Sequence, residues 1–192
     1  MSNSQIISGV DEAGRGPLAG EVYAAAVILN PSRPILGLKD SKKLSPKRRS
    51  DLSIQIKREA LAWSVSFSTV EEIDILNILN ATLLAMKRAV ESLSISPELA
   101  LIDGNRSPTI YGVRTQTIIK GDQTEPCISA ASIIAKVARD ERLMMLDQMY
   151  PQWGFRAHKG YGTKSHIAAI RAFGVTPFHR KSFEPIKPMG LN

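Results

Sequence analysis

Four acidic residues follow short apolar segments of the chain, and each has a glycine close by. They are Asp11, Glu12, Asp103 and Asp122, and the apolar segments before them are residues 6–10, 99–102 and 115–120. If these segments are neighbouring strands, the four carboxylates meet at one edge of a sheet. Carboxylates held together repel one another unless a cation neutralises them, and their hard oxygen atoms select Mg²⁺ or Mn²⁺. The pattern therefore predicts a carboxylate site for hard divalent ions.

Such a site can hydrolyse a phosphodiester. Two ions about 3.5–4 Å apart can activate a water molecule and stabilise the leaving oxygen. Adjacent residues of a regular strand face opposite sides, so Asp11 and Glu12 are expected to share a site only where the strand frays or twists. The glycines of the sequence AGRG, residues 13–16, permit that distortion. The N–H groups of this loop and Arg15 are then available to grip a substrate backbone.

Each acid also has an ordinary structural interpretation. Acidic residues at strand ends are common as turn formers and helix caps. Asp103 with Gly104 fits a simple turn, and Asp122 fits a cap at the start of a helix. The pattern alone leaves both interpretations open.

The charge balance indicates a polyanionic partner. The chain has 25 Lys and Arg against 18 Asp and Glu, a formal net charge of +7. Such an excess is typical of proteins that bind nucleic acid, although a basic protein without such a partner stays open. The longest apolar run, residues 22–29, is too short to span a bilayer. The single cysteine, Cys127, excludes an internal disulfide and is typical of a reducing cytoplasm.

Strands and helices alternate in the expected element order. Strands are expected at residues 6–10, 22–29, 63–70, 99–102 and 115–120. Helices are expected from Ser45 and Pro46 onward, along a face from Leu79 to Leu93, and at residues 129–150 and 164–173. This order predicts an α/β domain with a mixed sheet of about five strands flanked by helices. Whether the first two strands form a hairpin is left open.

Seven sequence blocks, in this order, resemble those of the bacterial ribonuclease HII family. They are GVDEAGRGPLAG, DSKKLS, EEIDILNILNAT, LIDGN, KGD, SAASIIAKVARD and HKGYGTKSH, and the resemblance covers Gly9 to about Pro185. The resemblance implies a ribonuclease H-like α/β fold with a C-terminal helical and basic segment. It also implies a single catalytic domain over residues 1–192, in which residues 151–192 form a substrate-binding extension.

The resemblance assigns the metal ligands residue by residue. It implies that Asp11, Glu12, Asp103 and Asp122 are the catalytic carboxylates and hold two Mg²⁺ or Mn²⁺ ions. Asp122 is preferred as the fourth ligand because the family places it in the KGD block. Its competitor is Asp140, which lies inside a predicted helix, where a salt bridge with a basic neighbour is expected.

Substrate contacts are also implied by the resemblance. Residues 14–16, Gly14, Arg15 and Gly16, resemble the family's reader of the RNA–DNA junction, and Tyr161 resembles the tyrosine that packs on the following deoxyribose. Lys42, Lys43, His158 and Lys159 are expected to contact phosphates. The remaining cations, Arg139, Arg142, Arg171, Arg180 and Lys181, are expected to form a general basic surface.

The implied activity is hydrolysis of the RNA strand of RNA–DNA hybrids, including single ribonucleotides embedded in duplex DNA, with 5′-phosphate and 3′-hydroxyl products. The implied partners are these two nucleic acids. A cytoplasmic monomer that serves replication and ribonucleotide excision repair is expected. Two alternatives stay open, a DNA-directed nuclease or junction resolvase and a duplex-binding module without catalysis. Cleavage of an all-DNA duplex would favour the first, and binding without a metal-dependent product would favour the second.

Overall fold

The computed structural model describes residues 5–38 and 44–189, and within them a mixed sheet forms the centre of the molecule. Its five strands are β1 (Ile7–Ala13), β2 (Val22–Ile28), β3 (Ala62–Ser68), β4 (Leu99–Asp103) and β5 (Arg114–Ile118), in the spatial order β3-β2-β1-β4-β5. The β1–β2 and β2–β3 pairs are antiparallel, whereas β1–β4 and β4–β5 are parallel. The predicted mixed sheet is confirmed, and its first two strands are an antiparallel pair.

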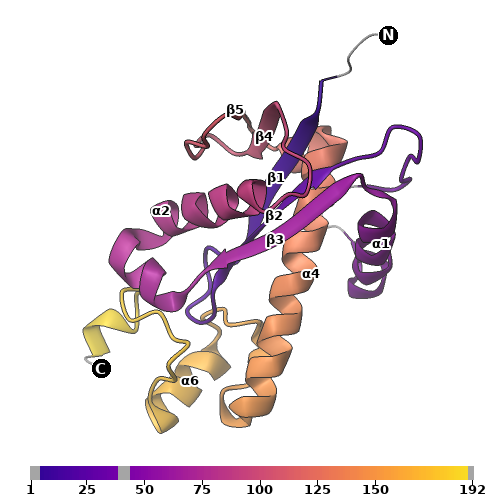
Figure 1. The fold of residues 1–192 in the computed structure, drawn as a ribbon. Helices are drawn as coiled ribbons and strands as arrows, with labels where there is room; N and C mark the ends of the chain where they lie inside the picture. Colours follow the sequence, from indigo (N-terminus) through magenta and orange to yellow (C-terminus); the bar gives the residue numbers. More distant parts are fainter. Residues whose placement is uncertain (1–4, 39–43, 190–192) are drawn as a thin grey trace.

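Helices cover both faces of this sheet (Figure 1). Helix α2 (Val70–Glu91) packs on one face, against a cluster that includes Val10, Ala24 and Ile102. Helices α4 (Pro126–Met149) and α1 (Pro46–Glu59) lie on the other face. Small side chains line the contact between α4 and the sheet, so the helix approaches the strands closely. These buried alanines are Ala25 on β2 and Ala130, Ala131 and Ala135 on α4.

Local capping sets the helix starts. The Ser45 hydroxyl accepts the N–H of Arg48 at 3.2 Å, and Pro46 occupies the first helical position, as predicted. At α2, Thr69 and Glu72 form a reciprocal capping box. Since Thr69 caps the helix, β3 ends at Ser68 and not at residue 70 as the alternation suggested.

Strand β1 is longer than the sequence pattern indicated. It continues through Asp11 and Glu12 to Ala13 and pairs with β2 over this whole stretch, with Ala13 opposite Tyr23. The expectation that the strand ends or frays before the two acids is therefore wrong. The antiparallel partner keeps the backbone extended through them.

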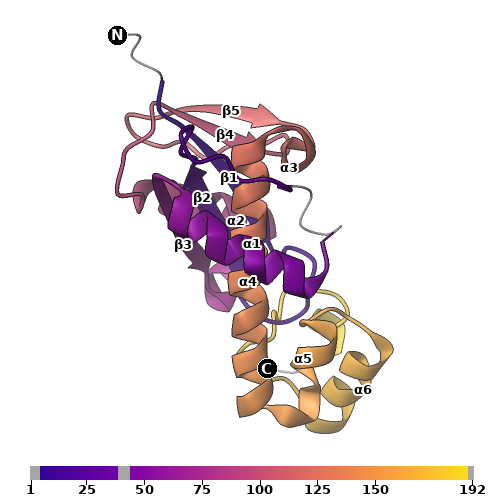
Figure 2. The same ribbon diagram turned by 90° about the vertical axis from the view of Figure 1, so that its right-hand side faces the viewer.

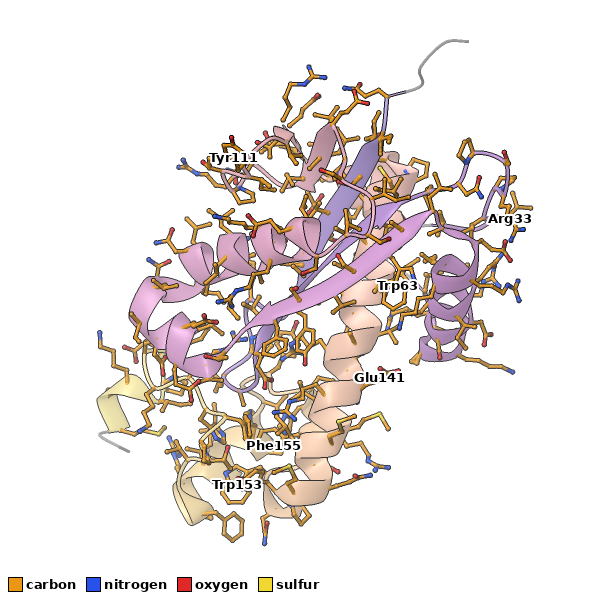
Figure 3. The ribbon with its side chains drawn as sticks, in the orientation of Figure 1. Arg33, Trp63, Tyr111, Glu141, Trp153 and Phe155 are labelled. Carbon is orange, nitrogen blue, oxygen red and sulfur yellow. The ribbon has the colours of Figure 1, made fainter. Side chains whose placement is uncertain are left out.

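The chain after α4 gathers at one end of the sheet (Figure 2). It contains η2 (Pro151–Trp153), α5 (Phe155–His158), α6 (Lys164–Phe173) and η3 (Lys187–Met189). Phe155 is fully buried and packs on Leu143 and Leu146, beside the C-terminal half of α4 (Figure 3). This C-terminal segment is thereby fixed to the core by apolar contacts. In the described part of the chain, no helix combines the length and apolar character that a membrane crossing needs.

Candidate active site

The four predicted carboxylates line one pocket of about 300 Å³. The lining residues are Asp11, Glu12 and Ala13 of β1, Gly14, Arg15 and Gly16 of the following loop, Asp103, Asp122, Ser132, Lys136, Arg139 and Tyr161. Strands β1 and β4, the short helix α3 (Gly121–Thr124), helix α4 and the C-terminal segment all contribute to it. The structure thus brings together acids that are up to 111 residues apart in the sequence (Asp11 to Asp122).

The sheet itself creates the space for these acids. The parallel ladder between β1 and β4 extends only to Val10 opposite Ile102, whereas β1 stays paired with β2 to Ala13. Asp11 and Asp103 come directly after the last β1–β4 pair. Strands β1 and β4 therefore separate at Asp11 and Asp103, and the carboxylates lie in the gap between the two strands.

Adjacent acids reach this opening from opposite faces of the sheet. Asp11 is buried, and its side chain bonds Ser132 on α4. Glu12 also lines a second, smaller pocket together with Leu79 and Thr82 of α2. Strand β1 borders the gap between β1 and β4, so side chains on both of its faces can approach Asp103. Asp103 accordingly lines both pockets.

Backbone hydrogen bonds hold the carboxylates in place. The Glu12 N–H donates to Asp11 Oδ1 at 2.7 Å, and the Asp122 N–H donates to Asp103 Oδ1 at 3.2 Å. Asp122 lies in the first turn of α3, and the capping position before it belongs to Lys120, whose φ is 58°. The cap interpretation of Asp122 is therefore wrong, and Asp103 does more than form a turn because its carboxylate accepts an N–H from α3.

The electrostatics of the pocket are those of crowded acids. Burial raises the pKa of Asp11 well above its ordinary value, and the charges of Glu12 and Asp103 raise it further. Burial also raises the pKa of Glu12, although Arg15, with an N···O distance of 3.5 Å, opposes this shift. A divalent cation would relieve the repulsion between these groups. The donor set, carboxylates alone with a serine hydroxyl near, fits a hard ion such as Mg²⁺ or Mn²⁺.

In this structure the side chains of the four acids are not arranged around one ion position. Over residues 5–38 and 44–189, no three Asp, Glu, His or Cys side chains are placed to hold one ion. The carboxylates instead bond partners of the protein, such as the N–H of Glu12 and the guanidinium of Arg15. Side-chain rotation within the pocket would have to bring their oxygen atoms onto a common ion.

The predicted substrate readers lie at the same pocket. Gly14, Arg15 and Gly16 line it together with Tyr161, whose side chain is 47% exposed. A Cβ placed on Gly16 would lie 3.7 Å from the Tyr161 ring, so the loop and the ring are neighbours. A nucleic-acid backbone that contacts the loop can therefore reach the tyrosine as well.

Other predicted contacts are placed differently. Both ring nitrogens of His158 bond the backbone, one to the Trp153 carbonyl at 2.7 Å and the other accepting the Gly160 N–H at 3.1 Å. The Lys159 carbonyl accepts Arg139 Nη2 at 3.0 Å. Lys42 and Lys43 lie outside the described residues.

Helix α4 supplies pocket residues that the pattern did not single out. Ser132, Lys136 and Arg139 follow one another at spacings of four and three, which places them on one helix face. This helical spacing of polar side chains is the sequence signal by which the three pocket residues could be found. Asp140 forms an ion pair with Lys136 and lies 3.7 Å from Arg49, so the predicted salt bridge of Asp140 is confirmed.

Two of the cations assigned to a general basic surface are not on the surface. Arg139 and Arg180 are 1% and 0% exposed. Arg139 donates to the carbonyls of Ala19 and Lys159, and Arg180 donates to three further backbone carbonyls. The expectation of a surface role is wrong for both, because their guanidinium groups bond the backbone of the interior.

Comparisons with known proteins agree with this geometry. The family model of ribonuclease HII matches residues 8–186. A ribonuclease HII of Chromobacterium violaceum is 60% identical over 181 residues, which cover 94% of this chain and 91% of that protein. The structure of the ribonuclease H2 from Pyrococcus horikoshii is similar at a TM-score of 0.79 and 28% identity, covering 95% of this chain and 96% of that one. Bst-RNase HIII in complex with Mn²⁺ shares the fold, with a TM-score of 0.70 and 19% identity over 96% of this chain and 68% of that one.

The match thus extends from β1, which carries the first two acids, to the end of the C-terminal segment. The mixed sheet with its flanking helices is the ribonuclease H fold of the similar structures. Sequence and structure lead to one assignment. The chain belongs to the ribonuclease HII family, whose members are metal-dependent nucleases that cleave RNA in RNA–DNA hybrids.

Proposed function

We propose that this protein hydrolyses the RNA strand at single ribonucleotides embedded in duplex DNA as well as in continuous RNA–DNA hybrids, leaving 5′-phosphate and 3′-hydroxyl ends. One observation carries the proposal. Four carboxylates, the backbone of residues 14–16 and the ring of Tyr161 line the same pocket. Groups for hydrolysis and groups for recognising a ribonucleotide are thereby within reach of one phosphodiester.

The proposed metal ligands are Asp11, Glu12, Asp103 and Asp122, with two Mg²⁺ or Mn²⁺ ions as the cofactors. The raised pKa of Asp11 supports this assignment, because a buried carboxylate beside two others is stabilised as an anion by a nearby cation. The related fold crystallised with Mn²⁺ is consistent with it. When bound, such ions supply an activated water and charge stabilisation at the leaving oxygen.

The protein's own groups orient the substrate. The N–H groups of residues 14–16 are proposed to contact the ribonucleotide, whose 2′-hydroxyl distinguishes RNA from DNA. Tyr161 is proposed to pack on the next sugar, where a deoxyribose leaves room for the ring. Lys42, Lys43 and Lys159 are proposed to contact phosphates. For His158 a phosphate contact would require the ring to exchange one of its two backbone hydrogen bonds, so we assign it a supporting role for the segment before Tyr161.

The chain is proposed to act as a single catalytic domain in which residues 151–192 extend the substrate-binding surface. The exposed side chains of Lys164 and Arg171 support this role, because they add positive charge to the surface of α6, the helix that follows Tyr161 in the sequence. A monomer in the cytoplasm, acting in replication and in the excision of misincorporated ribonucleotides, is the proposed setting.

A duplex that carries one ribonucleotide, end-labelled on that strand, tests the proposal. We expect a single cut beside the ribonucleotide in the presence of Mg²⁺ or Mn²⁺, and none with a chelator. An all-DNA duplex of the same sequence and Asp11→Asn are the controls, and neither should yield a product. Cutting of the all-DNA duplex at a similar rate would refute the ribonucleotide specificity.

A further inference from the structure

A buried guanidinium organises the loop after β1. Arg180 Nε donates to the Gly20 carbonyl at 2.9 Å, Nη1 to the Arg15 carbonyl at 2.8 Å and Nη2 to the Gly14 carbonyl at 2.6 Å. These carbonyls lie 160 to 166 residues away in the sequence, and Arg180 is 0% exposed. The C-terminal segment thus holds both ends of the loop through one side chain.

Burying the positive charge of Arg180 costs free energy. Among the ion pairs of the described residues none involves Arg180, and burial lowers its pKa to about 9. A buried charge without an acidic partner is unfavourable unless strong hydrogen bonds compensate it. The three charge-assisted bonds to the loop supply that compensation. The planar fork of arginine presents three separate nitrogens to three carbonyls, whereas a lysine carries its three N–H donors on a single nitrogen and does not match these positions.

The hydrogen bonds also fix where the loop's N–H groups point. In a trans peptide the C=O and the following N–H point in opposite directions. Since the carbonyls of Gly14 and Arg15 face Arg180, the N–H groups of Arg15 and Gly16 face away from it. Gly14, Arg15 and Gly16 line the acidic pocket, and the buried Arg180 lies behind them. Successive N–H groups turned to one side form a concave site for an electronegative atom.

A second buried arginine, Arg139, also bonds the loop after β1. Arg139 Nη2 donates to the Ala19 and Lys159 carbonyls, which joins the loop to the segment before Tyr161. Gly14 has a φ of 101°, and a Cβ there would lie 2.1 Å from Arg139 Nε. The loop therefore fits against the Arg139 side chain only with glycine at position 14.

We propose that Arg180 is a positioning residue for ribonucleotide recognition, which holds the loop carbonyls inward so that the N–H groups of Arg15 and Gly16 together face an oxygen of the scissile ribonucleotide. This inference rests on the proposed function. It goes beyond it in assigning the orientation of the loop to a residue that touches no substrate.

Arg180→Lys tests the proposal, because it keeps the charge and cannot bond all three carbonyls. The rate is measured in a single turnover with enzyme in excess on the duplex with one ribonucleotide, since misfolded enzyme then lowers the amount of active protein and not the rate constant. We expect the rate constant to fall about 10-fold or more, and by less than the roughly 10²- to 10³-fold that follows the removal of a donor at a reacting oxygen, because the loop N–H groups remain present but are less well oriented. Duplex affinity without metal should stay near that of the wild type. Amide hydrogen exchange should become faster at residues 14–20.

Arg88→Lys is the matched control. Arg88 also donates to a carbonyl, that of Phe67, and pairs with Glu72, but it lies on α2 away from the loop. It should leave the rate constant and the exchange at residues 14–20 unchanged. If Arg180→Lys does not fold, Arg180→Gln takes its place in the same measurements.

The outcomes are distinct. A wild-type rate in the Arg180 variant overturns the proposal, and so does a slower rate with unchanged exchange at residues 14–20. If Arg88→Lys lowered the rate constant as much as Arg180→Lys, the loss would be a general effect of replacing an arginine, and the proposal would also be overturned. If the wild type does not cut the duplex, the proposed function fails, whereas the exchange measurement still decides whether Arg180 holds the loop.

Discussion

Two regions of the protein bury ionisable side chains, and burial favours the uncharged form in both, but the surroundings of the two sets differ. At the sheet edge, burial and mutual repulsion raise the pKa of Asp11, and burial raises that of Glu12. In the C-terminal segment, burial lowers the pKa of His166 and of His179 to about 4 each. The acids also repel one another as long as no cation neutralises them, whereas the two histidines are uncharged and need no counter-charge.

Hydrogen bonds show how the histidines stay neutral. His179 Nδ1 accepts the Thr176 N–H at 2.8 Å, so its proton is on Nε2, which donates to His166 Nε2 at 3.1 Å. His166 Nδ1 in turn donates to the Tyr161 carbonyl at 2.9 Å. Every ring nitrogen of this pair has a partner inside the protein. The region that supports Tyr161 is therefore complete by itself, whereas we propose that the acidic edge binds a cation from outside.

The largest effect is expected from removing one acid of the edge. Asp11→Asn or Asp103→Asn should lower the cleavage rate by at least about 10³-fold, or about 4 kcal/mol, because the variant loses a charge that holds the ion. The free energy of unfolding should stay equal or rise, since repulsion in the metal-free site is relieved. Cleavage assays and urea unfolding measure both. The exposed Asp51→Asn on α1 is the control and should change neither. Near-normal turnover of either variant would refute the metal assignment.

The buried histidines should make the fold sensitive to acid. Their pKa falls from 6.5 to about 4 on folding, so between these values the unfolded chain binds more protons and stability decreases as the pH falls. At pH 5 each ring should cost about 2 kcal/mol relative to pH 8. The acids act with the opposite sign, because their raised pKa lets the folded state regain stability on protonation.

Urea unfolding at several pH values between 8 and 5 measures this loss. His179→Gln should flatten the pH dependence, and Asp11→Asn should steepen it, because the variant no longer gains from protonation of that acid. A pH dependence in His179→Gln that equals that of the wild type between pH 7 and pH 5 would contradict a neutral, buried His179.

Sequence patterns were sufficient where one local signal dominates. The cap at Ser45, the alternation in β3 and the spacing of α6 each predicted an element that the structure contains. The grouping of the four acids also followed from acids after apolar segments. These features depend on residues close together in the chain.

The missed features depend on partners that are distant in the sequence. Strand β1 continues through Asp11 because β2 pairs with it, and no local pattern in β1 reports that pairing. Arg139 and Arg180 look like surface cations because their acceptors are backbone carbonyls, which every residue has. Helix α2 begins at Val70, nine residues before the predicted face that starts at Leu79, and its backbone changes direction at Asn77, whose φ is 67°. Long-range contacts decided the strand and the two arginines, whereas the Asn77 side chain accepts the nearby N–H groups of Leu79 and Asn80.

Tyr161 should distinguish the two substrates. At an isolated ribonucleotide the next sugar is a deoxyribose on which the ring can pack, whereas within an RNA strand the next 2′-hydroxyl crowds it. A stacked aromatic contact contributes about 1–3 kcal/mol, so Tyr161→Ala should reduce kcat/KM on the isolated ribonucleotide by about 5- to 150-fold more than on a continuous hybrid. The ratio of kcat/KM values under one metal and salt condition measures this. An equal reduction on both substrates would make Tyr161 a general structural or backbone contact.

The smallest expected effect is stabilisation of the folded protein by the cation that we propose binds at the acidic edge. At a Mg²⁺ concentration ten times its Kd, binding to the folded state alone adds about 1.4 kcal/mol. For a chain of this size that corresponds to a rise in Tm of about 3–6 °C. Asp103→Asn should abolish the rise, because the variant removes both a ligand and part of the repulsion that the ion relieves. His179→Gln should retain it in full even though its own Tm is lower, since the histidines are satisfied without an ion. If Mg²⁺ stabilised Asp103→Asn as much as the wild type, the ion would be binding elsewhere, and the contrast between an incomplete acidic edge and a complete histidine pair would fail.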